Sequence, residues 1–133
     1  MKYLLDTNAC IVYLNKPQSG IAAKLRRHRL QDVFVCSVVK AELYFGAMQS
    51  QWPEKTLRMQ QQFLALFSSL PFDDEAARRF GDIRAALKKK GTPIGPYDLQ
   101  IAAIALANEC VLVTHNTGEF SRVDGLVLED WED

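Results

Sequence analysis

The chain has 133 residues, of which 48% are hydrophobic and 24% are charged, and these values are typical of a globular protein rather than a disordered one. This length fits one domain, so we expect residues 1–133 to fold as a single unit. The apolar runs are far shorter than the roughly 20 residues that a membrane-spanning helix needs. Asp6 interrupts the apolar N-terminus too early for a secretory signal. We therefore expect a cytoplasmic protein without a membrane partner, whose three cysteines are free buried thiols.

The formal net charge is zero, but the charges are unevenly distributed. Residues 1–70 carry 9 Lys/Arg and 4 Asp/Glu, whereas residues 71–133 carry 7 and 12. A neutral total excludes a protein that coats nucleic acid by bulk charge, but it allows an enzyme that binds nucleic acid through a local patch. The cationic candidates for such a patch are residues 26–29, Arg84 and residues 88–90.

The first half of the chain alternates short apolar runs with helical patterns. The expected elements are a strand at residues 2–5, helices over residues 7–13 and 19–30, a strand at residues 33–36 and a helix over residues 38–47. Asp6 and Ser37 are the residue types that cap a helix N-terminus, and Pro17 separates the first two helices.

The second half continues the alternation. We expect helices over residues 53–67, 74–90 and 96–106, and short strands at residues 70–72, 111–113 and 126–128. Asp73 is a typical N-cap for the long helix, while three lysines followed by Gly91 are typical of its C-terminus. Continuous apolar strands that alternate with helices predict an α/β fold, with a central parallel sheet of about four to five strands and helices on both faces.

Polar residues are expected at the carboxyl edge of this sheet, where ligands bind in parallel α/β folds. The candidates are Asp6 after the first strand, Glu42 one turn into the following helix, Asp98 in the first turn of an apolar helix, and Asn116 and Glu119 after a late strand. Asp6 alone could be a helix cap, and Asp98 alone could be a favourable charge at a helix N-terminus. Glu42 lies in a largely apolar helix, where a carboxylate is costly unless it is paired or bound to a metal.

Three acids on one edge would repel each other unless a cation lay between them. Oxygen ligands without a Cys or His cluster select Mg²⁺, with Mn²⁺ as a substitute, and such an ion suits phosphodiester chemistry. The chain has neither a phosphate-binding P-loop nor a serine nucleophile elbow. Dehalogenase-like phosphatases and receiver domains each need a lysine after a late strand, and no lysine follows Thr114.

Four segments in this order resemble the PIN-domain ribonucleases, and within them the VapC toxins of type II toxin–antitoxin systems. The segments are residues 1–8 (MKYLLDTN), 37–47 (SVVKAELYFGA), 95–103 (GPYDLQIAA) and 112–120 (LVTHNTGEF), followed by Gly125-Leu126 and Asp130-Trp131. The resemblance implies a PIN-like three-layer fold and a metal-dependent endoribonuclease. It also implies a homodimer, a VapB-type antitoxin partner and an RNA substrate, with tRNA as one precedent.

Carried over by position, Asp6 and Asp98 would hold the principal metal ion. Glu42 would bind this ion through water or help to hold a second one, and would orient the attacking water. Many relatives have an aspartate where this chain has Asn116, so Glu119 is expected to supply the missing carboxylate. His115 is expected beside the site, at the surface. The alternative function is a catalytically weak PIN-fold module that binds RNA or a protein partner.

Overall fold

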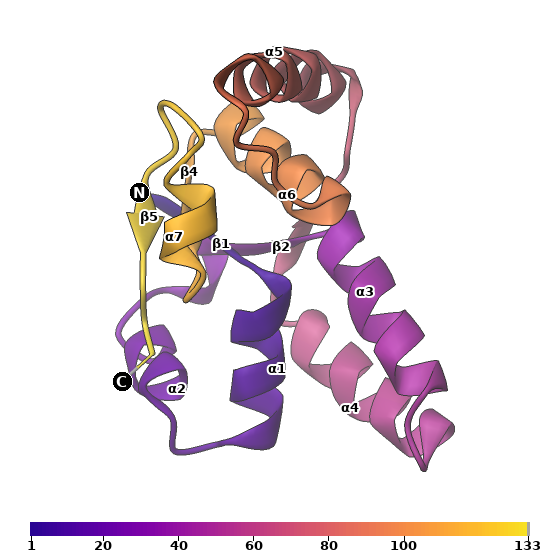
Figure 1. Ribbon diagram of the computed structural model, residues 1–133. Coiled ribbons are helices and arrows are strands. Elements are labelled where there is room, and N and C mark those ends of the chain that lie inside the picture. Colours follow the sequence, from indigo (N-terminus) through magenta and orange to yellow (C-terminus); the bar gives the residue numbers. More distant parts are fainter. Residues whose placement is uncertain (133) are drawn as a thin grey trace.

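Five short strands pair in parallel to form one sheet with the order β3-β2-β1-β4-β5, in a computed structural model that describes residues 1–132 (Figure 1). The strands are β1 (Lys2–Leu5), β2 (Val33–Cys36), β3 (Ser68–Leu70), β4 (Cys110–Val113) and β5 (Leu128–Glu129). The α/β class and the parallel sheet predicted from the sequence are therefore confirmed.

The composition of each strand matches its place in the sheet. β1, β2 and β4 form the centre and consist almost entirely of apolar side chains, of which Leu4, Val35 and Leu112 are fully buried. The edge strands β3 and β5 carry polar residues, including Ser68 and Glu129. Polar side chains suit an edge strand because its outer side remains in contact with water and must not pair with another chain.

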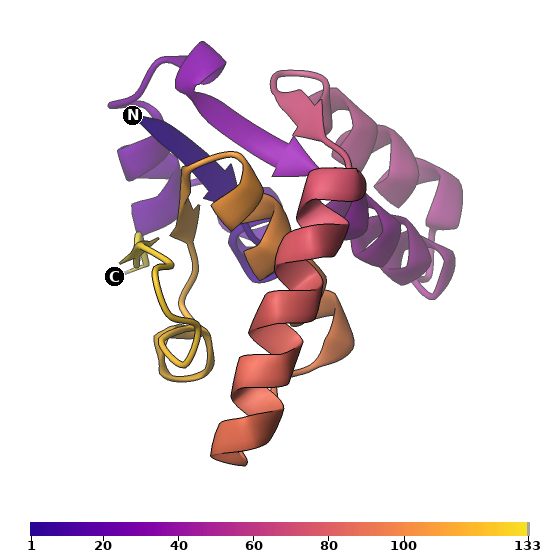
Figure 2. The same ribbon diagram turned by 90° about the horizontal axis from the view of Figure 1, so that it is seen from above.

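Helices cover both faces of the sheet, as expected. They are α1 (Thr7–Asn15), α2 (Gly20–Leu25), α3 (Ser37–Met48), α4 (Pro53–Leu64), α5 (Asp74–Lys90), α6 (Pro96–Ala107) and α7 (Thr117–Phe120). In Figure 1, α5 and α6 lie above the central strands, while α1, α2 and α4 lie below them. Figure 2, seen from above, shows α5 as the outer helix of its pair. No helix within residues 1–132 is long and apolar enough to cross a membrane.

The direction in which the sheet grows reverses between β1 and β4. The chain builds β1, β2 and β3 toward one edge and then returns to add β4 and β5 on the other side of β1. Such a reversal opens a crevice beyond the carboxyl ends of the two strands that flank it. Asp6 follows β1 and Thr114 follows β4, so both lie at this position.

The ends of α5 confirm the capping residues expected from the sequence. The Asp73 side chain accepts a hydrogen bond from the Ala76 N–H at 3.0 Å. Gly91 ends the helix in the left-handed region, with a φ of 71°, and the Thr92 N–H donates to the Leu87 carbonyl at 3.0 Å. These contacts satisfy backbone groups that a helix end otherwise leaves without partners.

Several predicted boundaries are wrong. The helix expected to reach residue 30 ends at Leu25, because the following cationic run supplies no apolar stripe, and Leu30 is exposed at the start of a 3-10 turn. Ser37 is the first residue of α3 and makes no capping hydrogen bond, so Cys36 occupies the N-cap position. Pairing with β2 places β3 at residues 68–70, and α4 therefore ends earlier than expected. The three cysteines are free and buried, as expected.

Gly81 and Gly91 provide a matched test of the α5 terminus. We expect Gly81→Ala to raise the free energy of unfolding by about 0.5–1 kcal/mol, because alanine is the better helix former and nothing lies within 4 Å of the added methyl group. We expect Gly91→Ala to lower it by about 1 kcal/mol, because its left-handed backbone disfavours a side chain although the surrounding space is equally open. Urea unfolding measures both values. Changes of the same sign would contradict this account of the helix terminus.

Candidate active site

Asp6 connects the two central strands with the first helix. Its N–H donates to the Val113 carbonyl at 3.1 Å, which continues the pairing of β1 with β4. One side-chain oxygen, Oδ1, accepts a hydrogen bond from the Ala9 N–H at 2.8 Å, so Asp6 does cap α1. Its side chain is only 4% exposed, and burial raises its pKa even though a hydrogen bond with Thr114 acts in the opposite direction. Asp6 therefore caps α1 and also places a buried carboxylate at the carboxyl edge of the sheet.

Glu42 reaches the same crevice from α3. Its Oε1 accepts a hydrogen bond from the Thr7 hydroxyl at 2.6 Å, which fixes the carboxylate beside the first turn of α1. Glu42 is half-buried, and its neighbour Phe45 is 68% exposed, so α3 is less enclosed than the sequence suggested. The repulsion of nearby acids therefore provides a stronger reason for a cation than the burial of Glu42 alone.

Asp98 lies in the first turn of α6, and its environment shows that the acids meet. Burial and, to a smaller extent, the negative charges of Glu119, Glu42 and Asp6 together raise the pKa of Asp98 to about 6. A charge acts on a pKa only over a limited distance, so these effects indicate that the four carboxylates lie near one another at the carboxyl edge of the sheet. The crevice is formed by residues that follow β1 and β4 and by the helices α3, α6 and α7.

Asn116 and Glu119 complete this group in a way that the sequence did not specify. The Asn116 side-chain amide donates to Glu119 Oε2 at 3.2 Å, and the Gly95 N–H donates to Glu119 Oε1 at 3.1 Å. These two hydrogen bonds are the main causes that lower the pKa of Glu119, with the larger effect from Asn116. Asn116 therefore holds Glu119 as an anion beside Asp98, and the neutral amide serves as a hydrogen-bond donor.

His115 lies at the surface, as expected. Its side chain is 64% exposed, and its Nδ1 lies 2.9 Å from carboxylate oxygens of both Asp130 and Glu132. The hydrogen bond with Asp130 is the main cause that raises its pKa. His115 therefore belongs to a second group of side chains next to the crevice.

The donor set of the crevice fits a hard divalent cation. Carboxylate oxygens dominate it, and Mg²⁺ and Mn²⁺ prefer such ligands. None of the six ion pairs formed within residues 1–132 involves a carboxylate of the crevice. Within this part of the chain, no ion pair therefore neutralises Asp6, Glu42, Asp98 or Glu119, although the charge of Arg122 acts on Glu119, and a divalent ion would relieve the mutual repulsion of the four acids.

Sequence reasoning did not assign roles to two threonines of this site. Thr7 donates to Glu42, while Thr114 is almost fully buried and hydrogen-bonds both the Asp6 carboxylate and the Asn116 N–H. Their positions were the available signal: Thr7 follows Asp6 at the end of β1, and Thr114 directly follows β4. Both threonines hold site residues in position.

Comparison with known proteins identifies the family of this chain. A family profile described as the PIN domain matches residues 3–126. The chain belongs to the PIN-domain family. The tRNA(fMet)-specific endonuclease VapC of Shigella flexneri is 42% identical, and Ribonuclease VapC2 of Haemophilus influenzae is 36% identical, each over 98% of both chains. Within the PIN family, the chain is therefore a VapC-type ribonuclease toxin, and the predicted resemblance is confirmed.

Solved structures agree with this assignment. The DNA-bound VapBC structure from Salmonella typhimurium contains a chain with a TM-score of 0.93 and 37% identity over 98% of both chains. The VapBC2 structure from Rickettsia felis, bound to a promoter DNA fragment, contains one with a TM-score of 0.92 and 32% identity, which covers 99% of this chain and 100% of its own. The overall fold of the chain is therefore the VapC form of the PIN fold.

The raised pKa of Asp98 predicts that this residue destabilises the metal-free protein at neutral pH. A folded-state pKa of about 6, against 3.8 for the unfolded reference, means that the folded protein binds more protons between these values. Stability therefore falls as pH rises through this window and stays lower above it. We expect Asp98→Asn to raise the melting temperature in EDTA at pH 7.5, with a smaller gain at pH 4.5.

Thermal unfolding of both proteins at the two pH values measures this difference. Asp124→Asn is the matched control, because Asp124 is exposed and pairs with Lys90 away from the crevice. An equal gain at both pH values would show that the charge of Asp98 is not responsible.

Proposed function

We propose that this protein is a metal-dependent endoribonuclease that hydrolyses RNA phosphodiester bonds as the toxin of a toxin–antitoxin pair. The observation that carries the proposal is the group of four neighbouring carboxylates, none of them in an ion pair within residues 1–132, beyond β1 and β4 of a VapC-type PIN domain. The mutual repulsion of four carboxylates destabilises the fold, and a bound divalent ion would offset this repulsion. We expect Mg²⁺ as the ion, with Mn²⁺ as a substitute.

Each residue of the crevice has a distinct role in this proposal. Asp6 and Asp98 would hold the ion, which when bound supplies positive charge to the scissile phosphate and favours in-line attack. Glu42, held by the Thr7 hydroxyl, would accept a proton from the attacking water. Glu119 would add negative charge to the site, and Asn116 would keep Glu119 in position.

Cationic side chains near α6 support an RNA-binding role. Arg84 and Lys88 on α5 line a pocket of about 600 Å³ together with Pro96, which begins the helix that carries Asp98. Arg122 donates to the Pro93 carbonyl at 3.0 Å, and its charge acts on Glu119. In the 26–29 cluster, Arg29 already pairs with Asp32, so we favour Arg84, Lys88 and Arg122 as the RNA-binding cations. We propose that they contact phosphates of the RNA, and the names of the enterobacterial relatives favour tRNA as the substrate.

The surface of α1, α3 and α4 supports the proposed protein partners. Several of its apolar side chains are exposed by 39% to 68%: Ile11, Phe45, Met48, Trp52 and Met59. A groove of about 300 Å³ is lined by Ile11, Met59 and Gln60 and extends to Glu42. We propose that a VapB-type antitoxin occupies this groove and that two toxin chains form a homodimer. Both would act in the cytoplasm, where RNA substrate and antitoxin are made.

A catalytically weak binding module is the second candidate function. The departure from aspartate at position 116 favours it, because an amide adds no charge to the metal site. The hydrogen bond from Asn116 to Glu119 argues against a binding module, because Glu119, one turn later in the chain, supplies a carboxylate to the site. A binding module would retain RNA affinity without any requirement for the four carboxylates.

Cleavage of end-labelled total tRNA tests the proposed activity. We expect antitoxin-free protein to produce discrete fragments with Mg²⁺ or Mn²⁺ and none in EDTA. Asp6→Asn should lower the cleavage rate by at least about 100-fold, since it removes a charged metal ligand but little volume.

Two controls make the cleavage result interpretable. Asp124→Asn changes an exposed carboxylate outside the crevice and should retain the wild-type rate. Circular dichroism should show that Asp6→Asn remains folded. Metal-independent binding of tRNA without cleavage, unchanged in Asp6→Asn, would support the binding module and contradict the enzyme.

The proposed role of Asn116 predicts non-additive effects with Glu119. If Asn116 acts by holding Glu119, Asn116→Ala and Glu119→Gln should each lower the cleavage rate by about tenfold, and the double variant should lose about as much as either single variant. Single-turnover cleavage at saturating Mn²⁺ measures the three rates. A loss of about 100-fold in the double variant would mean that the two residues act independently.

A further inference from the structure

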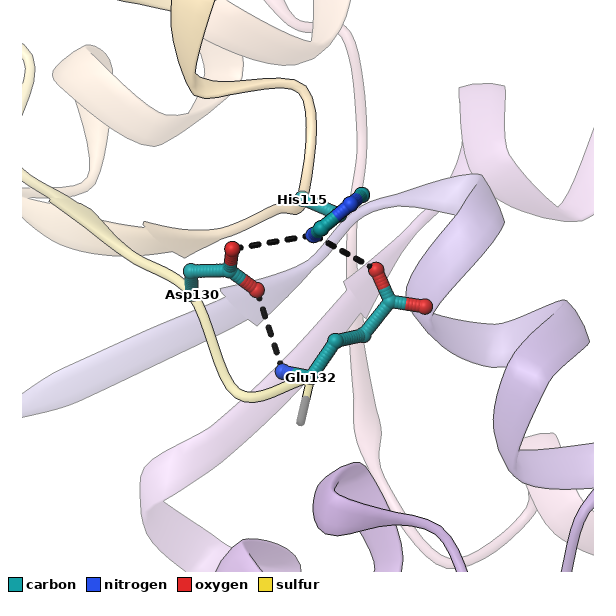
Figure 3. A group of neighbouring side chains, drawn as sticks. All are labelled: His115, Asp130 and Glu132. Carbon is teal, nitrogen blue, oxygen red and sulfur yellow. Dashed lines mark hydrogen bonds and ion pairs between the residues drawn. The ribbon is translucent and has the colours of Figure 1, made fainter.

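A second group of metal-ligating side chains lies next to the crevice (Figure 3). His115 follows β4, while Asp130 and Glu132 follow β5, so two separate segments bring the three together. His115 Nδ1 lies 2.9 Å from Asp130 Oδ2 and 2.9 Å from Glu132 Oε2. Within residues 1–132, this is the set of three potential ligands whose donor atoms all lie within 4.8 Å of one another.

One nitrogen faces two carboxylate oxygens in this group. An imidazole Nδ1 carries at most one proton, so it can donate one well-directed hydrogen bond and not two. A divalent ion in place of this proton would be bound by all three atoms at once. Tetrahedral coordination at 2.0–2.2 Å separates neighbouring ligands by about 3.4 Å, so the nitrogen–oxygen distances of 2.9 Å need to open by only a few tenths of an ångström.

The surroundings of the group suit a bound ion. The second oxygen of Asp130 accepts a hydrogen bond from the Glu132 N–H at 3.0 Å, which fixes the orientation of the carboxylate. Such contacts orient the ligands at metal sites. His115 and Glu132 also line an open pocket of about 630 Å³ with Ser19 and Gly20, which leaves room for water as a further ligand.

We propose that His115, Asp130 and Glu132 bind a divalent transition-metal ion, with Zn²⁺ as the preferred occupant. One imidazole with two carboxylates is a borderline donor set, which favours Zn²⁺ or Co²⁺ over Mg²⁺. The all-oxygen crevice that contains Asp6 has the opposite preference. The ion at the second site ties the C-terminal segment to the loop between β4 and α7. The two sites therefore bind different ions and are tested separately.

Isothermal titration of Zn²⁺ tests this site. The background is the Asp6→Asn/Asp98→Asn double variant, which removes the two charged ligands of the crevice. We expect one Zn²⁺ per chain, and at least about tenfold weaker binding after His115→Gln or Asp130→Asn, because each removes a direct ligand. Asp124→Asn should leave the affinity unchanged, since this exposed residue pairs with Lys90 elsewhere. The buried cysteines are not expected to compete for the ion.

Thermal unfolding gives a second readout that does not depend on activity. Zn²⁺ should raise the melting temperature of the background protein and should not raise that of the His115→Gln variant. If the double variant fails to fold, the wild-type chain in saturating Mg²⁺ replaces it. Zn²⁺ binding that is unchanged by His115→Gln and Asp130→Asn, or the absence of Zn²⁺ binding, would overturn the proposal. In the second case, the three side chains would form an ion pair and nothing more.

Discussion

The parallel pairing of β1 with β4 is the constraint on which the site depends. Their register, with Leu5 opposite Val113, places Asp6 beside Thr114 at the same edge of the sheet. Both strands are buried on both faces, so a shift in register would expose apolar side chains and is disfavoured. The reversal of strand order at this pair then opens the crevice into which α3, α6 and α7 bring their polar residues.

The neighbouring acids destabilise the metal-free fold, although the proposed function needs them to bind an ion. Burial and like charges raise the pKa values of Asp6 and Asp98, so the metal-free fold would be more stable with fewer carboxylates. Asn116 reduces this cost because a neutral amide stands where a fifth acid would add repulsion, and it stabilises Glu119 as an anion. Functional sites commonly retain such strain, since the charges that destabilise the empty fold are those that bind the ion.

The differences between expectation and structure have a common physical origin. The sequence predicted a helix through residue 30, but α2 ends at Leu25, and the His28 ring beyond its end packs against Trp131 and Tyr3. Ser37 is a favourable cap by type, yet it is an exposed first residue of α3 and makes no capping hydrogen bond. The burial of Glu42 was overestimated because the apolar residues of α3 do not all face the core, and Phe45 is exposed. Local patterns describe propensity, whereas neighbouring elements decide where a side chain points.

The sequence alone determined the α/β class, the approximate elements and the five candidate site residues. It could do so because buried strands need continuous apolar runs, and because a polar residue directly after such a run must lie at the sheet edge. Only the tertiary structure decided how the candidates relate: Thr7 holds Glu42, Asn116 holds Glu119, and His115 joins Asp130 and Glu132 outside the crevice. The contacts of Thr7 with Glu42 and of His115 with Asp130 join segments far apart in the sequence, and their distances follow from packing and strand order, which residue spacing does not encode. The contact of Asn116 with Glu119 is local, and only the orientation of the two side chains at the start of α7 shows it.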